Sequence, residues 1–172
     1  VILTGERNLL FAHPDNTAFV QLILPSEAIQ DLDASYQTMG NALLQSIHTL
    51  GVHQAWYKHR GSIRVRGDKI ASFVIAGIES TALINAVVFL GPLETRDFLR
   101  VVWVPPEVRD KALEPMTSVE QETGKKPNWH EVKAVVAASM EHAFQMELQE
   151  GTMVRDELFG YEKLRSLAYK AR

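Results

Sequence analysis

The sequence predicts an α+β fold: a mixed, mostly antiparallel sheet with flanking helices. Apolar runs rich in Val, Ile and Phe follow one another through the first half of the chain with short connections, which indicates antiparallel pairing rather than alternating βαβ units. Helical periodicity is confined to one segment of the first half and to the chain beyond Pro105. With 172 residues, no repeats and no low-complexity linker, the chain fits one domain over residues 1–172.

The first expected elements are two strands and a long helix. Residues 9–11 and 19–24 are expected to be strands on either side of a turn at 13–16, where Pro, Asp and Asn suit turn geometry. A helix is expected from residue 25 to Gly51, which stops it. Its apolar residues recur at helical spacing and are expected to pack on the sheet: Ile29, Leu32, Tyr36, Met39, Leu43, Leu44, Ile47 and Leu50.

A hairpin in the middle of the chain carries a lysine of special interest. Further strands are expected at 52–57, 63–65, 70–78 and 83–90. The Gly67-Asp68 pair suits a two-residue II′ turn with glycine first, which places Lys69 at the start of an apolar strand. An ammonium held there is a fixed positive charge that can lie against a phosphate or a carbonyl gaining negative charge during acyl transfer. The alternative is a surface lysine that follows a turn.

The last part of the chain is expected to be helical. Thr117 and Glu120 resemble a capping box for a short helix that ends near Gly124. Asn128 with Glu131 caps the next helix, which places on one side Trp129, Val132, Val136, Met140, Ala143 and Phe144. A final helix after Gly160 carries Leu164, Leu167 and Ala168.

Composition limits the function classes. A net charge of −3 gives no reason to expect nucleic acid or a membrane as partner. The absence of cysteine excludes disulfides, thiolate metal sites and a cysteine acyl-enzyme. Residues 70–93 carry one charge, yet their turn-forming interruption favours two buried strands over a membrane span. The N-terminus lacks a signal-peptide pattern and begins without Met, so we expect a cytoplasmic protein with further residues upstream or on a second chain.

Polar motifs leave several readings open. No two of the six histidines have helical i, i+4 spacing, so no metal site is expected; His48 suits a helix end, and His13 lies in a turn beside a strand. No dinucleotide fingerprint, phosphate loop or nucleophile elbow is present. One dense basic cluster is either a solvated face or a site for phosphate or an acidic partner: Lys58, His59, Arg60, Arg64, Arg66 and Lys69.

Five segments stand in a familiar order: Phe-Ala-His-Pro-Asp-Asn at 11–16, Gly-Asp-Lys-Ile-Ala at 67–71, Asp97 after a strand pair, Thr-Ser-Val at 117–119 and Tyr-Glu-Lys-Leu at 161–164. Together they resemble the lipoate-protein ligase A family of the biotin/lipoate ligase superfamily. The resemblance implies a biotin/lipoate ligase-like (class II synthetase-like) fold. It also implies ATP and lipoate as ligands, a lipoyl-adenylate intermediate and transfer of the acyl group to a lysine of a lipoyl carrier domain.

The resemblance assigns roles to individual residues. Lys69 falls where the family has its essential lysine, which contacts the acyl carbonyl and the adenylate phosphate, so Lys69 is the implied catalytic residue. The residues implied to contact ATP or the acyl-adenylate and the acid are Thr4, Gly5, Arg7, His13, Ser62 and Ser72.

The chain departs from the family pattern at two places. The family's arginine- and glycine-rich stretch falls near residues 4–9, where only Thr4 and Gly5 fit. The family's Asn-Asp pair, associated with metal and nucleotide, reads Gly61-Ser62, so magnesium binding is not supported. The family's N-terminal portion is also missing, which suggests a second subunit that supplies it.

Three functions therefore stay open. The first is a lipoate-protein ligase-like acyltransferase that uses ATP or a preformed adenylate. The second is a non-catalytic relative that acts as a binding or scaffolding protein, which the altered motifs favour. The third is a biotin-protein ligase, which has the same fold and a similarly placed lysine. The lack of cysteine excludes relatives that move the acyl group through a cysteine thioester.

Overall fold

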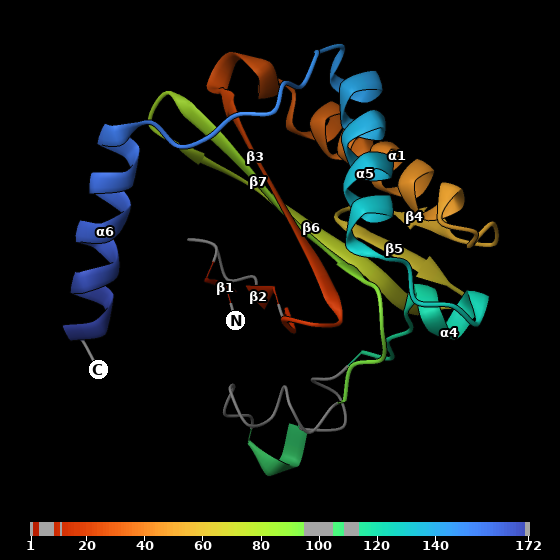
Figure 1. The fold of residues 1–172 in the computed structure, drawn as a ribbon. Helices are drawn as coiled ribbons and strands as arrows, with labels where there is room; N and C mark the ends of the chain where they lie inside the picture. Colours follow the sequence, from red (N-terminus) through yellow and green to blue (C-terminus); the bar gives the residue numbers. More distant parts are fainter. Residues whose placement is uncertain (1, 4–8, 11, 95–104, 109–113, 171–172) are drawn as a thin grey trace.

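A five-stranded antiparallel sheet organises the chain. The structure is a computed structural model that describes residues 2–3, 9–10, 12–94, 105–108 and 114–170. The strands are β3 (Thr17–Pro25), β4 (Trp56–Lys58), β5 (Ser62–Val65), β6 (Asp68–Ile78) and β7 (Thr81–Phe89), in the spatial order β3-β7-β6-β5-β4 (Figure 1). Strands β1 (Ile2–Leu3) and β2 (Leu9–Leu10) pair separately. The predicted α+β fold is confirmed.

Helices cover one face of this sheet. The helical elements are η1 (Ser26–Ile29), α1 (Leu32–Thr49), η2 (Pro106–Val108), α4 (Val119–Thr123), α5 (Trp129–Phe144) and α6 (Arg155–Lys170). Helices α1 and α5 lie together on one side of the sheet, and α6 stands on the other side (Figure 1). Within the ranges given above, no helix combines the length and apolarity needed to cross a bilayer.

The hydrophobic core lies between the sheet and helices α1 and α5. Strand alternation sends Ala18 and Ile84 toward these helices, where Met39, Leu43 and Met140 are almost completely buried. We call the opposite side the second face of the sheet. It carries a small buried cluster of Val74, Val87 and Phe89, and on β3 it exposes Phe19 and Ile23.

Two predicted boundaries in the first half are wrong. The long helix begins at Leu32, because the Asp31 carboxylate accepts a hydrogen bond from the backbone N–H of Ala34 and caps it there. Residues 26–29 form a separate 3₁₀ turn. The strand expected from residue 52 begins only at Trp56, because the Val52 N–H still bonds to the Ile47 carbonyl after the helix.

The later helices also differ from expectation. The cap of α4 is Ser118 rather than Thr117, and Gly124 ends this helix with a positive φ as predicted. Asn128 caps α5 as predicted, but Trp129 is 57% exposed and does not join the buried side. Helix α6 begins at Arg155, so Gly160 lies inside it rather than before it.

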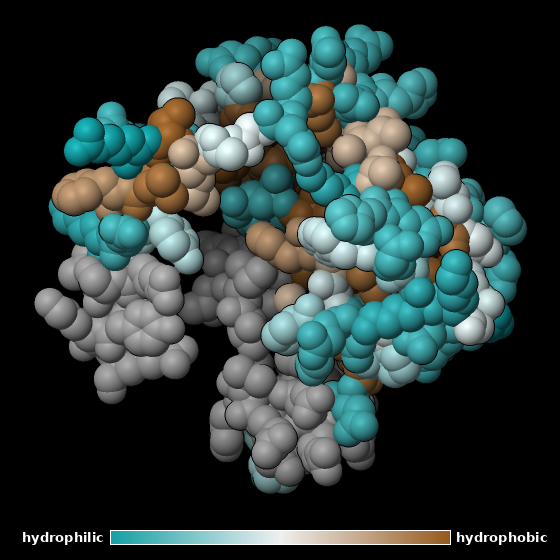
Figure 2. Space-filling view, viewed as in Figure 1, coloured by the Kyte–Doolittle hydropathy of each residue, from teal (hydrophilic) through white to brown (hydrophobic). Residues whose placement is uncertain are grey.

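The space-filling view separates polar from apolar surfaces. Hydrophilic side chains cover the outward surfaces of α4 and α5, whereas hydrophobic ones gather at the start of α6 (Figure 2). There Val154, Leu158 and Phe159 are exposed. The core is therefore covered on the side of α1 and α5.

Candidate functional site

The hairpin that carries Lys69 has a different turn from the predicted one. The two residues between β5 and β6 are Arg66 and Gly67, with φ of 51° and 106°, and Val65 pairs with Asp68. Two positive φ angles are typical of a I′ turn rather than the expected II′ turn at Gly67-Asp68. The turn begins one residue earlier than predicted, and Lys69 becomes the second residue of β6.

A β-bulge next to this turn determines where Lys69 points. Ser62 pairs with Ser72 and Ile63 with Ala71, but Arg64 pairs with Lys69, so Ile70 is an extra residue in β6. Because side chains alternate along a strand, Lys69 would otherwise share the helix-covered face with Ala71. The bulge turns it to the second face of the sheet.

The predicted residues Lys69, Ser62 and Ser72 are therefore brought together on the second face. Ser62 and Ser72 are directly paired, and Arg64 lies two residues beyond Ser62 on the same face. The Ser72 hydroxyl donates a hydrogen bond of 3.1 Å to the Gly61 carbonyl, and Ser62 is buried. Ser62 and Arg64 of β5 thus lie opposite Ser72 and Lys69 of β6.

Lys69 is held in place by a segment distant in sequence. Its backbone N–H donates to the Pro115 carbonyl at 2.9 Å, and the Thr117 N–H donates to the Lys69 carbonyl at 3.0 Å. Its Nζ lies 2.7 Å from Oε2 of Glu114, and its side chain is 24% exposed. The ammonium is thus fixed and paired, rather than moving in bulk solvent.

Arg64 meets the same carboxylate oxygen. Its Nη2 lies 2.8 Å from Oε2 of Glu114, and its Nη1 donates to the Gly67 carbonyl at 2.7 Å. The Arg64 side chain is only 11% exposed, whereas that of Glu114 is 51% exposed. The hydrogen bond from Lys69, with a smaller contribution from Arg64, lowers the pKa of the Glu114 carboxyl from its ordinary value of 4.5. One carboxylate oxygen therefore lies between two cations.

The residues present do not fit a magnesium ion. The Gly61 carbonyl accepts hydrogen bonds from the Ser72 hydroxyl and, at 2.9 Å, from the Phe73 N–H. The described carboxylate beside Lys69 is that of Glu114, and two cations already hold its oxygen. Elsewhere in the described ranges, no group of three His, Asp or Glu side chains could hold a metal ion. Magnesium prefers several free oxygen ligands, and this donor set lacks them.

His13 lies at the same end of the sheet as Lys69, two strands away. Its backbone N–H donates to Oγ1 of Thr17, the first residue of β3, and its Nδ1 accepts from the Asp15 N–H at 3.3 Å. The turn is docked through Asn16, whose carbonyl accepts from the Leu90 and Gly91 N–H groups. The described contacts do not join His13 to Lys69. The predicted residues Thr4, Gly5, Arg7 and Asp97 lie outside the described residues.

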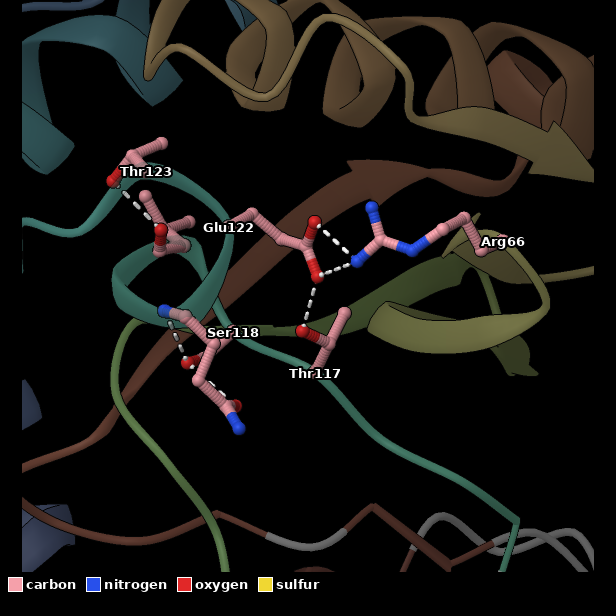
Figure 3. Close-up of polar contacts among 7 residues, drawn as sticks. Arg66, Thr117, Ser118, Glu122 and Thr123 are labelled. Carbon is pink, nitrogen blue, oxygen red and sulfur yellow. Dashed lines mark hydrogen bonds and ion pairs between the residues drawn. The ribbon is translucent and has the colours of Figure 1, made fainter.

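The predicted basic cluster does not form one free positive surface. Arg66 donates to both oxygens of Glu122, whose side chain is only 4% exposed and also accepts from the Thr117 hydroxyl at 2.6 Å (Figure 3). Arg60 pairs with Asp33 at 2.5 Å. The carboxylates of Asp33, Glu114 and Glu122, which come from three separate segments, thus divide the cluster into separate ion pairs.

Sequence patterns identify Arg64 only as part of that cluster and do not reveal Glu114. Glu114 stands just before a proline in a segment without periodicity, so no local pattern marks it. The bulge did leave a signal, because Ile70 and Ala71 are adjacent apolar residues that break the alternation of β6.

A cavity of about 380 Å³ lies elsewhere, between η1, α1 and the end of α5. Small and polar side chains line most of it, among them Asp31, Ser35 and Thr38. None of the predicted site residues lines it.

Comparisons with known proteins reveal the fold. No family model and no curated protein matches the chain. A bi-partite lipoate protein ligase from Thermoplasma acidophilum superposes with a TM-score of 0.69 at 18% identity over 87% of this chain. A lipoate-protein ligase A bound with ATP superposes with a TM-score of 0.65 at 16% identity over 86% of this chain. An apo biotin protein ligase from Aquifex aeolicus superposes with a TM-score of 0.58 at 12% identity over 76% of this chain.

The chain thus has the fold shared by lipoate and biotin protein ligases, as the sequence resemblance implied. It spans 59% and 60% of the two lipoate ligase chains and 53% of the biotin ligase chain.

Proposed function

We propose that this chain is an acyltransferase of the biotin/lipoate ligase family that transfers lipoate or a related acid from an acyl-adenylate to a lysine of a carrier domain. The observation that carries the proposal is the placement of Lys69. A bulge turns it to the second face of the sheet, and the segment around Glu114 holds it there. A fixed cation is what electrostatic catalysis of acyl transfer requires.

The proposed role of Lys69 follows from the charges in the reaction. The neutral carrier amine attacks the acyl carbonyl and a C–N bond forms. The bond between the acyl carbon and the phosphate oxygen breaks as AMP leaves with the electron pair, and the amine proton passes to solvent. Negative charge builds on the carbonyl oxygen and then on the leaving phosphate. In this proposal the Lys69 ammonium offsets this charge more strongly in the transition state than in the ground state.

The acid to be tested follows from the comparisons rather than from a free apolar surface. Val74, Val87 and Phe89 form an apolar cluster on the second face, but the chain itself buries them, with Met116 packed against the cluster while its backbone pairs with Lys69. The lipoate ligases superpose with higher TM-scores and coverage than the biotin ligase, so we take lipoate as the first acid to test and biotin as the second.

The proposed partners are a lipoyl carrier domain and a second chain. The T. acidophilum ligase is described as bi-partite and was analysed with its E2 lipoyl domain. We propose the second chain by analogy with that bi-partite ligase, of whose ligase chain the present chain covers 59%.

Mass spectrometry of a carrier domain tests this proposal. The carrier is mixed with the chain and lipoyl-adenylate, or with ATP, magnesium and lipoate, and a parallel series uses biotin and its carrier. Lys69→Ala should lower the rate of acylation at least about 100-fold, because removing one charge-stabilising donor costs about this much. The control Lys133→Ala removes an exposed lysine that pairs with Glu150 and should leave the rate unchanged.

A non-catalytic binding protein is the second candidate. The ion pair between Lys69 and Glu114 and the Gly61-Ser62 replacement favour it, because they occupy or remove groups that the family uses. A carrier that gains no mass from either acyl-adenylate, although calorimetry detects binding of lipoate or biotin, would support this second function against the first.

A further inference from the structure

Arg64 and Lys69 form a pair of cations on adjacent strands. They are opposite each other in the register of β5 and β6, on the second face of the sheet. Their nitrogens lie 2.8 and 2.7 Å from the same oxygen of Glu114. Two positive charges therefore converge on one anionic oxygen, which is an arrangement that binds carboxylate or phosphoryl oxygens strongly.

The site is built into the sheet rather than formed by surface chains. The Arg64 side chain is 11% exposed, and the Gly67 carbonyl fixes its Nη1. Its Nε is buried and has no hydrogen-bond partner. A buried guanidinium with an unused donor indicates that Glu114 does not satisfy the site fully, because buried polar groups are normally paired.

The occupant is the most exposed member of the group. The Glu114 side chain is 51% exposed and belongs to a segment that backbone hydrogen bonds hold beside Lys69. One carboxylate balances only one of the two positive charges. A phosphoryl group carries more oxygens and more negative charge than a carboxylate, so it could pair with both cations.

We propose that Arg64 and Lys69 together bind the phosphoryl group of a nucleotide, and that Glu114 occupies this site when the nucleotide is absent and competes with it. The proposal rests on the proposed function only for the identity of the nucleotide as an adenylate. Arg64 is then a second binding residue beside Lys69, and Glu114 is an internal competitor that weakens nucleotide binding.

Calorimetry of the full chain with AMP and with inorganic phosphate tests the proposal. At low ionic strength, where screening is weak, Glu114→Gln should tighten the Kd for AMP about tenfold and Arg64→Gln should weaken it about tenfold. Two control variants carry the matching charge changes and should leave the Kd unchanged. Arg66→Gln, on the same hairpin, matches Arg64→Gln, and the remote, exposed Glu150→Gln matches Glu114→Gln.

Each possible result either supports or overturns the proposal. If the Kd values for inorganic phosphate follow the same order among the variants as those for AMP, phosphoryl recognition is supported. If only the Kd values for AMP change, phosphoryl recognition is overturned in favour of contacts with the nucleoside. Equal effects of Arg64→Gln and Arg66→Gln, an unchanged Kd in Glu114→Gln, or no binding in any variant also overturns the proposal. Thermal unfolding confirms that each variant folds. If Arg64→Gln does not fold, the Kd of Glu114→Gln still tests the proposal, because the Glu114 side chain is half-exposed and its substitution should be tolerated. The result is independent of carrier acylation, so this proposal and the proposed function can fail separately.

Discussion

Glu114 shows how one residue links stability to the candidate site. Lys69 and Arg64 stabilise its ionised form, which lowers the pKa of its carboxyl in the folded chain below the ordinary value of 4.5. A lowered pKa in the folded state means that the unfolded state binds the proton more tightly. The ion pairs of Glu114 therefore stabilise the fold above the ordinary carboxyl pKa, and this contribution is lost as the pH falls through the lowered one.

Chemical denaturation at several pH values tests this contribution. At about pH 7 the parent should be more stable than Glu114→Gln, by at most about 1 kcal/mol because half of this side chain is exposed. The difference should persist as the pH approaches 4.5, shrink below it, and vanish once the folded carboxyl is protonated. A difference that stays constant down to about pH 3 would show that charge is not its cause.

At the scale of elements, the contact between α1 and β4 depends on a glycine. A Cβ atom on Gly40 would lie 2.5 Å from the ring of Tyr57. That ring cannot move freely, since its hydroxyl donates to the Tyr36 carbonyl at 2.9 Å and its face stacks on Phe73. Burial raises the pKa of the Tyr57 phenol, which keeps it protonated as a donor. Gly40 is thus required by close packing within a helix that alanine would otherwise favour.

Alanine at position 40 should separate packing from helix propensity. Gly40→Ala should destabilise the fold by about 1–3 kcal/mol, because the added methyl group overpacks the contact. The control Gly160→Ala in α6 has open space around its Cβ and should stabilise its helix by about 0.5–1 kcal/mol. In a Tyr57→Ala background, Gly40→Ala should become neutral or stabilising in urea denaturation. If it stays as harmful there as in the parent, the ring is not the obstacle.

The same scale shows which elements the sequence could predict. Asn128 capped α5 as expected, because the cap and its hydrogen bond to Glu131 are local. The strands β6 and β7 followed from long apolar runs. The position of Glu114 could not be predicted, because it depends on pairing between Lys69 and a segment distant in sequence. The bulge at Ile70 left only a weak signal, because adjacent apolar residues also occur elsewhere in β6. Trp129 was misplaced because helical periodicity does not say where the packed face ends.

At the scale of the whole molecule, the two faces of the sheet carry different tasks. One face packs on α1 and α5 and supplies the main core. The second face holds the cations Arg64 and Lys69, a polar pair between Gln21 and Asn85, and exposed apolar residues on β3. Stability thus depends mostly on the first face, although Val74, Val87 and Phe89 form a smaller buried cluster on the second face.

Matched isoleucine truncations on the two faces test this division. Ile84 on β7 is fully buried against the helices, whereas Ile23 on β3 is 65% exposed on the second face. Ile84→Ala should lower the free energy of unfolding by about 2–5 kcal/mol, because it removes buried methyl groups and leaves a cavity. Ile23→Ala removes the same atoms from a solvated position and should change it by less than about 0.5 kcal/mol. Urea denaturation with equal m-values for both variants measures the difference. A loss in Ile23→Ala as large as that in Ile84→Ala would mean that the second face is also core, and the separation of stability from ligand binding would be wrong.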